Sequence, residues 1–566
     1  MTAWEERWDN STRFLASAVH LDDRLADIFV QEYLTQPHRA IPPSPGVRAE
    51  IVLREAVAAR SRRRSLNVAL CLVFTLLLVT AFPIVFGWTL SAVSWRVCKA
   101  LVIRLGTSQA LARFGLGLTG TGEQWWATVV LWSASSMVWL IALVPVATVA
   151  GQLGGTVPAV PMIIGFVLLV PTMYVTLVGA RYLPWGTALS WYSIANFDPD
   201  APIRARVAKV CARYTDRLRL IANDDLRRIQ SQSDEVIVFR GRKPFVGAGP
   251  LVRNWSAAFE LRHAKSTPAK PLAVPQFQPS GLQDHVAAEL EKLRKPENLT
   301  PGWRFRELEI SRWAIVSAAQ LPLAPDLDTV MRQLTDGVRP TLPEPVWRDL
   351  ADGSPEWLRF YRCYRIEGWS RGLTVAGYLH VGCEERMLVL EWNAFVLPPV
   401  AAQFCQVDSP PTMLEARCMV NALSDLALLP TTMPTRVTDI VRSFREVSAA
   451  GNGYWRTPAE ASVAYGAAAS IRELAAAATF TNYFQQSDSD RYLKILERRV
   501  LDSVSQFLAA REIVAVGFDQ VVTQINNSTI INNSNVIAGS IGGQDNTGEV
   551  SINDTNSGGS SDSGVD

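Results

Sequence analysis

The sequence predicts a membrane-anchored α+β protein with a helical transmembrane block, then a soluble domain of antiparallel sheet and helices, then a disordered tail. Three observations predict this class. Residues 125–180 carry no charged side chain, which leaves room for two helical crossings of about 20 residues each. Residues 360–395 contain three short segments with the alternation typical of strands. After Gly517 the chain becomes rich in Asn, Ser, Gly and Asp, a composition typical of disorder.

Composition limits the class of protein. A chain of 566 residues exceeds the size of a single core, so it should contain several domains. A mean hydropathy of +0.10 indicates that only part of the chain lies in lipid. Lys+Arg 55 against Asp+Glu 53 nearly cancel, which argues against a nucleic-acid partner. The seven cysteines are dispersed and form no C-x-x-C motif, so we expect a reducing compartment around the soluble part.

The N-terminal region, residues 1–64, is predicted to form amphipathic helices. Apolar residues recur at helical spacing over residues 11–36, and a second helix is expected over 47–64. The first ten residues are acidic and lack the features of a cleavable signal peptide. Arginines cluster at the end of this region, immediately before the first apolar segment.

Residues 65–197 are predicted to be the transmembrane region. Two interpretations of the uncharged segment 65–95 remain open, namely one tilted crossing or a kinked pair of helices that enters and returns. A basic amphipathic helix should follow over 96–113, and glycines at 151–155 mark a turn. Basic flanks favour a cytoplasmic soluble domain on a protein integral to the plasma membrane. Because residues 125–180 lack an ionisable group, this block is predicted to be an anchor rather than a transporter.

Residues 198–515 are predicted to form the soluble α+β domain. After a helix over 203–230, a strand at 236–239 is expected to pair with a strand at 255–261, and another strand is expected near 308–316. The meander of 360–367, 373–381 and 387–395 should form the main antiparallel sheet. Helices should dominate from residue 413 onward and pack on this sheet.

Several motifs in this order resemble a group of uncharacterised actinobacterial integral membrane proteins. They are Leu21–Ala26, Arg39–Gly46, Ala58–Arg60, Pro244–Gly249 with Trp255–Ser256, the region of Trp369, and Val396–Pro399. The resemblance spans most of residues 15–400. It implies a shared architecture and carries no assigned activity.

One glycine-bearing loop is a candidate ligand site. Its residues Lys243, Phe245, Gly247 and Gly249 lie between two predicted strands, beside a second basic residue. Two interpretations are open, a hairpin turn or a loop that cradles an anionic ligand. The segment lacks the phosphate-binding glycine motifs, which favours the hairpin. Five scattered histidines and adjacent carboxylate pairs identify no catalytic residue, and we predict no metal site and no cofactor.

The tail, residues 516–566, contains a six-residue repeat. Ile opens each of three hexads and Ser is fourth in each, over residues 525–542. Aliphatic rows and Asn ladders are buried by stacked β-strands, so the tail is a candidate for self-assembly. The candidate residues are Ile525, Asn526, Ile531, Asn532 and Ile537. The repeat loosely resembles the amyloid signalling motifs of bacterial cell-death effectors, and a featureless Asn/Ser tail is the alternative.

Two functional hypotheses follow. The first is a membrane-anchored interaction or signalling protein of unknown biochemical activity, whose partners are the lipid bilayer and a protein or further copies of itself. The second is a membrane-tethered enzyme or ligand-binding domain that uses the loop from Lys243 to Gly249.

Overall fold

The structure is a computed structural model that describes residues 10–105, 159–229, 234–266, 272–295, 305, 307–323, 328–336, 339–369, 371–448, 458–480, 482–528 and 551–553. The chain divides into two compact units. The sheet unit comprises Met1–Ala56, Tyr192–Asp408 and Asn452–Asp566. The helical unit comprises Val57–Trp191 and Ser409–Gly451.

The sheet unit begins with two helices, α1 (Asn10–Leu21) and α2 (Asp23–Tyr33), where the sequence predicts one. The break falls at Asp22, whose side chain accepts hydrogen bonds from the amides of Arg24 at 2.9 Å and Leu25 at 3.3 Å. An aspartate that caps its own backbone in this way starts a new helix. The next helix, α3 (Ala49–Thr80), starts in the sheet unit and continues into the helical unit.

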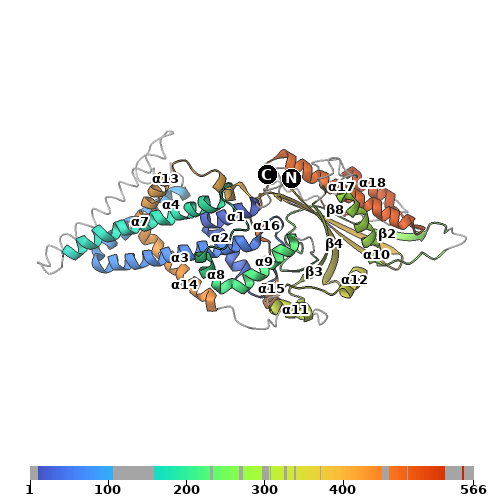
Figure 1. The fold of residues 1–566 in the computed structure, drawn as a ribbon, viewed down its shortest axis with the longest axis horizontal. Coiled ribbons are helices and arrows are strands. Elements are labelled where there is room, and N and C mark those ends of the chain that lie inside the picture. Colours follow the sequence, from blue (N-terminus) through green and yellow to red (C-terminus); the bar gives the residue numbers. More distant parts are fainter. Residues whose placement is uncertain are drawn as a thin grey trace, which may run out of the picture. The chain divides into compact units, whose positions relative to one another are not determined.

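The described strands form one sheet in the order β1-β3-β4-β5-β6-β2-β7, and β8 pairs with β2 outside this path (Figure 1). The strands are β1 (Glu235–Phe239), β2 (Leu251–His263), β3 (Leu308–Ser317), β4 (Leu358–Gly368), β5 (Leu373–Glu384), β6 (Met387–Leu397), β7 (Ile513–Ala515) and β8 (Ser551–Asn553). The predicted meander is confirmed, because β4, β5 and β6 pair antiparallel in sequence order.

Two expectations about the sheet are wrong. The sheet is mixed rather than antiparallel, because β1 pairs with β3 in parallel. The expected partner of β1, β2, instead lies near the other end of the sheet and pairs antiparallel with β6. The long connection from β1 to β3 allows this crossover, since parallel neighbours require a connection much longer than a hairpin turn.

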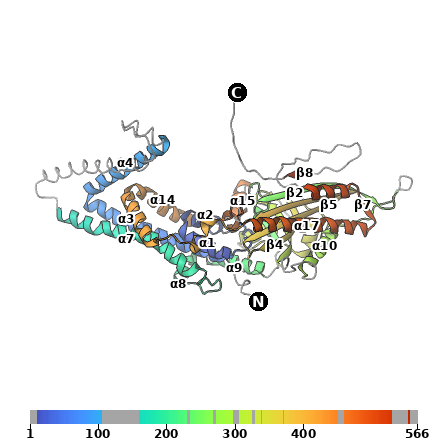
Figure 2. The same ribbon diagram turned by 90° about the horizontal axis from the view of Figure 1, so that it is seen from above.

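One face of the sheet is covered by helices, of which α10 (Pro279–Glu291) and α17 (Tyr483–Ala509) are the longest (Figures 1 and 2). Every second residue of the central strands points into this core, including Trp255, Tyr364 and Trp392. The other helices of this unit are α8 (Ala205–Cys211), α9 (Thr215–Ile229), α11 (Asp328–Thr335), α12 (Glu344–Asp352), α15 (Pro458–Tyr465), α16 (Ile471–Leu474) and α18 (Phe518–Ser528).

The helical unit contains most of α3 together with α4 (Phe82–Leu105), α7 (Ala159–Tyr192), α13 (Leu414–Ala427) and α14 (Leu429–Ser448). The segment 65–95 is therefore two helices that meet at Ala81, rather than one continuous helix. Among the described residues, two helical segments are long and apolar enough to cross a membrane, Ala49–Thr80 and Val167–Tyr192. The predicted turn at 151–155 lies outside the described residues.

The sequence assigns α13 and α14 to the soluble domain, whereas the structure places them in the helical unit. They share an apolar core with α3, α4 and α7 that includes Leu70, Leu77, Met173, Leu177 and Leu429. Their sequence contains the charged residues expected of a water-soluble helix, and only their contacts show which unit they join.

The prediction of disorder over residues 516–566 is wrong for the parts that the structure describes, which are α18 and β8. Residues 518–528 form α18, whose Phe518, Val521 and Ile525 are buried in the main core. Composition suggested disorder, but these three residues recur at helical spacing and this apolar face packs on the domain.

Candidate functional site

A row of polar side chains crosses the face of the sheet opposite α10 and α17. Ser256 of β2 is the cross-strand neighbour of Glu391 of β6, which is the neighbour of His380 of β5. The rings of His380 and Tyr361 of β4 lie 5.5 Å apart. We call Ser256, Glu391, His380 and Tyr361 the polar row. Their sequence neighbours point into the core, so the alternation of the strands places all four on one face.

The carboxylate of Glu391 is the centre of the polar row. Its Oε1 accepts hydrogen bonds from Tyr361 Oη at 3.0 Å and from Asn393 Nδ2 at 2.8 Å. Its Oε2 accepts from an Arg359 guanidinium nitrogen at 3.2 Å. Burial raises the pKa of Tyr361, and the neighbouring charge of Glu391 raises it further. Tyr361 therefore stays protonated at neutral pH and acts as a donor to Glu391.

His380 offers an acceptor on the same face. Its Nδ1 lies 2.8 Å from the carbonyl oxygen of Phe360, and because a carbonyl only accepts, we assign the proton to Nδ1. In the neutral ring Nε2 then carries a lone pair. Such an imidazole, oriented by a backbone carbonyl, suits either hydrogen bonding to a ligand or proton transfer.

Three members of the polar row are accessible, whereas Tyr361 is buried against Phe245. Ser256 and Arg359 are exposed, and His380 and Glu391 are half-buried. Beside the row, the side-chain oxygen of Asn254 is buried and has no hydrogen-bond partner among the described residues. The accessible part of the face thus presents the Ser256 hydroxyl and the His380 imidazole nitrogen, which can accept hydrogen bonds from a partner. Within the described part of the chain, no three His, Cys, Asp or Glu residues are grouped to hold a metal ion.

The predicted ligand loop lies on the same sheet face and links β1 to β2. The ring of Phe245 packs against Tyr361, Tyr378 and Phe395, with centroid distances of 5.0, 4.7 and 4.8 Å. Lys243 is exposed, whereas Gly247 is buried. The loop therefore crosses the sheet beside the polar row instead of forming a hairpin.

Backbone groups of this loop are used within the protein. The amide of Gly249 donates to Glu473 Oε1 at 2.9 Å. The amides of Val246 and Ala248 donate to carbonyls of the loop itself, at 3.0 and 3.2 Å. Gly247 has a φ of +96°, and a Cβ there would lie 2.3 Å from the carbonyl oxygen of Pro43. The glycine thus allows the proline-rich segment before α3 to pass directly over the loop.

The structure describes two of the five candidate self-assembly residues. Ile525 is fully buried in α18, and its carbonyl accepts a hydrogen bond from Arg253 at 2.8 Å. Asn526 lies one residue further along the same helix. Ile531, Asn532 and Ile537 lie outside the described residues.

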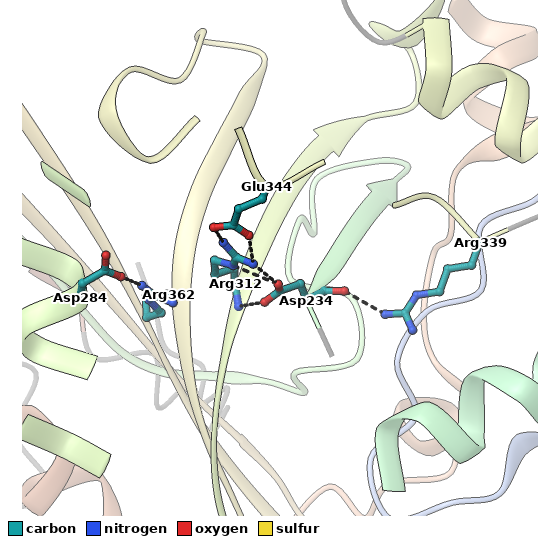
Figure 3. Close-up of polar contacts among 6 residues, drawn as sticks. All are labelled: Asp234, Asp284, Arg312, Arg339, Glu344 and Arg362. Carbon is teal, nitrogen blue, oxygen red and sulfur yellow. Dashed lines mark hydrogen bonds and ion pairs between the residues drawn. The ribbon is translucent and has the colours of Figure 1, made fainter. Parts of the chain in front are cut away.

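A separate cluster of arginines and carboxylates joins β1 to β3 and to the start of α12 (Figure 3). Arg312 Nε donates to Asp234 at 2.9 Å, and its two terminal nitrogens contact Glu344 at 2.8 and 2.9 Å. Its hydrogen bond lowers the pKa of Glu344. The remaining pairs are Arg339–Asp224, Arg339–Glu235 and Arg362–Asp284. These carboxylates already pair with arginines, so we interpret the cluster as a set of ion pairs that stabilises the fold.

Sequence reasoning missed the polar row. Each member alternates with core residues, which marks a position on the outer face of a strand. The sequence does not show how the strands pair. Only the pairing of β6 with β2 and with β5 brings Glu391 beside Ser256 and His380.

A family model, the AbeC-like domain, matches residues 254–542, just over half of the 566 residues. The matched region starts in β2 and includes the polar row, α13, α14, α17 and α18. Comparisons with curated proteins and with solved structures found no match.

Proposed function

The chain belongs to the AbeC-like domain family, and we propose that this member is a membrane-anchored interaction protein whose sheet unit binds a protein partner. The observation that carries the proposal is the exposure of the apolar helices. Only 17% of the most apolar stretch of α3 and 11% of that of α7 is buried inside the protein. A core helix of a soluble protein would be mostly buried, whereas a lipid-facing helix needs an apolar exterior.

Membrane extraction tests the anchor. We expect full-length protein to stay with membranes during alkaline carbonate and urea washes, and to dissolve only in detergent, since aliphatic side chains such as Leu72, Leu76 and Val79 would be exposed in water. Release of folded protein by carbonate alone would contradict the proposal.

We further propose that the sheet unit faces the cytoplasm from the plasma membrane. Arg60, Arg62, Arg63 and Arg64 precede the apolar part of α3, and Arg204, Arg206 and Lys209 follow α7. Basic residues near the ends of membrane segments favour the cytoplasmic side. Protease added to intact cells should leave a C-terminal epitope intact and should remove it in inverted vesicles.

The polar row is the surface that we assign to the partner. It supplies oriented donors and acceptors, which give specificity when a partner satisfies them. A photo-crosslinking residue at Ser256 in the full-length protein should give a discrete adduct in cells. The matched control is Ala288, which is exposed on α10 on the opposite face. Equal adducts at both positions, or none at Ser256, would exclude this surface.

A second candidate function is the binding of a small donor-rich ligand at the same face. Its support is the buried Asn254 Oδ1, which has no hydrogen-bond partner among the described residues and lies two strands from His380 on the same face. Thermal-shift measurements on the detergent-solubilised full chain, with nucleotides and lipid headgroups, test it. A stabilising ligand should lose its effect in N254A, and a shift that persists there would place the ligand elsewhere.

We also propose that the tail beyond α18 assembles homotypically and so supplies a signalling output. Two complete hexads remain after Ser528, and identical aliphatic and Asn residues stack well in cross-β structure. A peptide of residues 529–550 should form thioflavin-positive fibres. The matched control replaces Ile531 and Ile537 with Asp. If the unmodified peptide stays monomeric at high concentration, this part of the proposal is wrong.

A further inference from the structure

The helix pair α13–α14 packs on those parts of α3, α4 and α7 that carry no charge. Trp88 Nε1 donates to the carbonyl of Ala427 at 2.9 Å, and Tyr174 Oη donates to the carbonyl of Met419 at 3.2 Å. Leu429 shares a buried cluster with residues of α3 and α7. Figures 1 and 2 both show α14 beside α3 and α4. The pair therefore belongs to the same packed unit as the candidate membrane spans.

The middle of the pair carries few charged side chains, whereas Glu415, Arg417, Arg436, Asp439, Arg442, Arg445 and Glu446 lie toward its two ends. From Cys418 to Thr435 the only charged side chain is Asp425. Arg181 pairs with it through two contacts of 2.7 and 3.0 Å. Arg181 ends the uncharged run, which would place this ion pair near the membrane surface. A paired carboxylate at that level is far less costly than an isolated one.

Hydroxyl groups of the pair are satisfied by their own helices. Ser424 bonds the carbonyl of Val420, Thr431 bonds Leu428, and Thr432 bonds Leu429, at 3.4, 2.7 and 2.9 Å. Side-chain hydroxyls that return to the helix backbone need no water. This is the arrangement that lipid requires of polar groups.

Apolar stripes on the pair are exposed among the described residues, beside exposed polar residues such as Asn421 and Asp439. Met419, Val420 and Leu423 of α13 are 51%, 64% and 59% exposed. Their spacing forms one stripe on the helix. On α14, Val437 and Val441 form a second stripe one helical turn apart, with exposures of 48% and 44%.

A groove connects α14 to the apolar surface of α3. Six of its lining residues are Val68, Cys71, Leu72, Leu76 and Val79 of α3 and Ile440 of α14, and its volume is about 480 Å³. The apolar surface of the candidate membrane span therefore reaches α14 at Ile440. A hydrocarbon chain matches the apolar chemistry of such a groove.

We propose that α13–α14 is a membrane-embedded element whose apolar stripes and groove contact phospholipid acyl chains. The proposal rests on the membrane location put forward above for α3 and α7. Its consequence is that the AbeC-like region, residues 254–542, is itself partly seated in the bilayer and is not a purely water-soluble domain.

The test uses full-length protein in vesicles of phosphatidylcholine and phosphatidylglycerol. A bimane fluorophore is placed by single cysteines, in a background without native cysteines, at Leu423, Val441, Leu76 and Ser256. We expect a nitroxide on the lipid acyl chain to quench Leu423 and Val441 as strongly as Leu76, and to leave Ser256 unquenched. The result that would overturn the proposal is quenching at Leu76 alone, with Leu423 and Val441 open to an aqueous quencher.

A second measurement requires no substitution. Wild-type protein in vesicles with a diazirine-bearing phosphatidylcholine should give lipid adducts on α13 or α14 peptides as well as on α3. Adducts on α3 without adducts on α13 and α14 contradict the inference. The absence of adducts from α3 as well would instead contradict the membrane anchor, so the two failures are distinguishable.

Discussion

Gly241 and Gly247 share a left-handed backbone but have different surroundings. Their φ angles are +77° and +96°. Nothing lies within 4 Å of a Cβ built at Gly241, whereas one at Gly247 would lie 2.3 Å from Pro43 O and 2.9 Å from Pro43 Cγ. Substitution at the first position therefore tests backbone strain alone, and substitution at the second adds overpacking.

We predict that G241A lowers the free energy of unfolding of the sheet unit by about 1–2 kcal/mol, the cost of a left-handed alanine. G247A should lower it by about 2–5 kcal/mol, because overpacking adds roughly 1–3 kcal/mol. Urea unfolding followed by tryptophan fluorescence measures both. Equal losses of unfolding free energy in G241A and G247A would show that the segment containing Pro43 moves away from the added methyl group without an energetic cost.

Glu497 is a buried carboxyl whose protonation should be visible in stability. It accepts a hydrogen bond from Trp255 Nε1 at 2.6 Å and lies 3.2 Å from Arg253. Burial raises the pKa of Glu497, although Arg253 and Trp255 act in the opposite direction. The folded state therefore holds this proton more tightly than the unfolded chain does.

The sign of the pH dependence follows. This contribution to stability is fully present below the unfolded pKa of about 4.3 and is lost as pH rises through the higher folded pKa. In E497Q the side-chain oxygen still accepts the hydrogen bond from Trp255, but the side chain does not titrate. The decrease in stability with rising pH should therefore disappear. Urea unfolding of wild type and E497Q across that range tests it. Parallel stability profiles would rule out Glu497 as the source.

At the scale of elements, the sequence predicted the features that depend on residues close together in the chain. The meander of β4, β5 and β6 was predictable because each strand alternates and short turns join them. The β1–β2 hairpin was wrong because a strand's partner is set by packing across the whole sheet. The polar row was unpredictable for the same reason, since its members come from four strands.

The helix α18 allows a direct test of where the domain ends. Truncation after Gly517 removes Phe518, Val521 and Ile525 from the main core. Each such side chain contributes about 1.5–3 kcal/mol when fully buried, so the loss should exceed the entropy that the freed segment regains. Truncation after Ser528 is the matched reference, because both truncations also remove β8 and the difference in unfolding free energy between them therefore measures α18. Both are measured by urea unfolding, and equal stability would mean that α18 contributes little.

At the scale of the whole molecule, two cores of different character lie in one chain. The sheet unit buries aromatic residues such as Trp255, Trp313 and Trp392 between a sheet and its covering layers. Among the described residues, the helical unit buries a smaller cluster and exposes aliphatic side chains on α3 and α7. The uncharged run predicted the helical unit from the sequence. That α13 and α14 belong to this unit depends on their contacts with helices far away in the chain.

These two cores should unfold separately in detergent. Helical hydrogen bonds inside a micelle have no competing water, so urea should unfold the sheet unit first and the helical unit later or not at all. Near-ultraviolet dichroism, which reports the packed tryptophans, should therefore change at lower urea than far-ultraviolet dichroism. G247A should shift only the first transition, because its contact lies within the sheet unit. A single transition shared by both signals, and shifted as a whole by G247A, would mean that α3, which runs through both units, couples them into one cooperative structure.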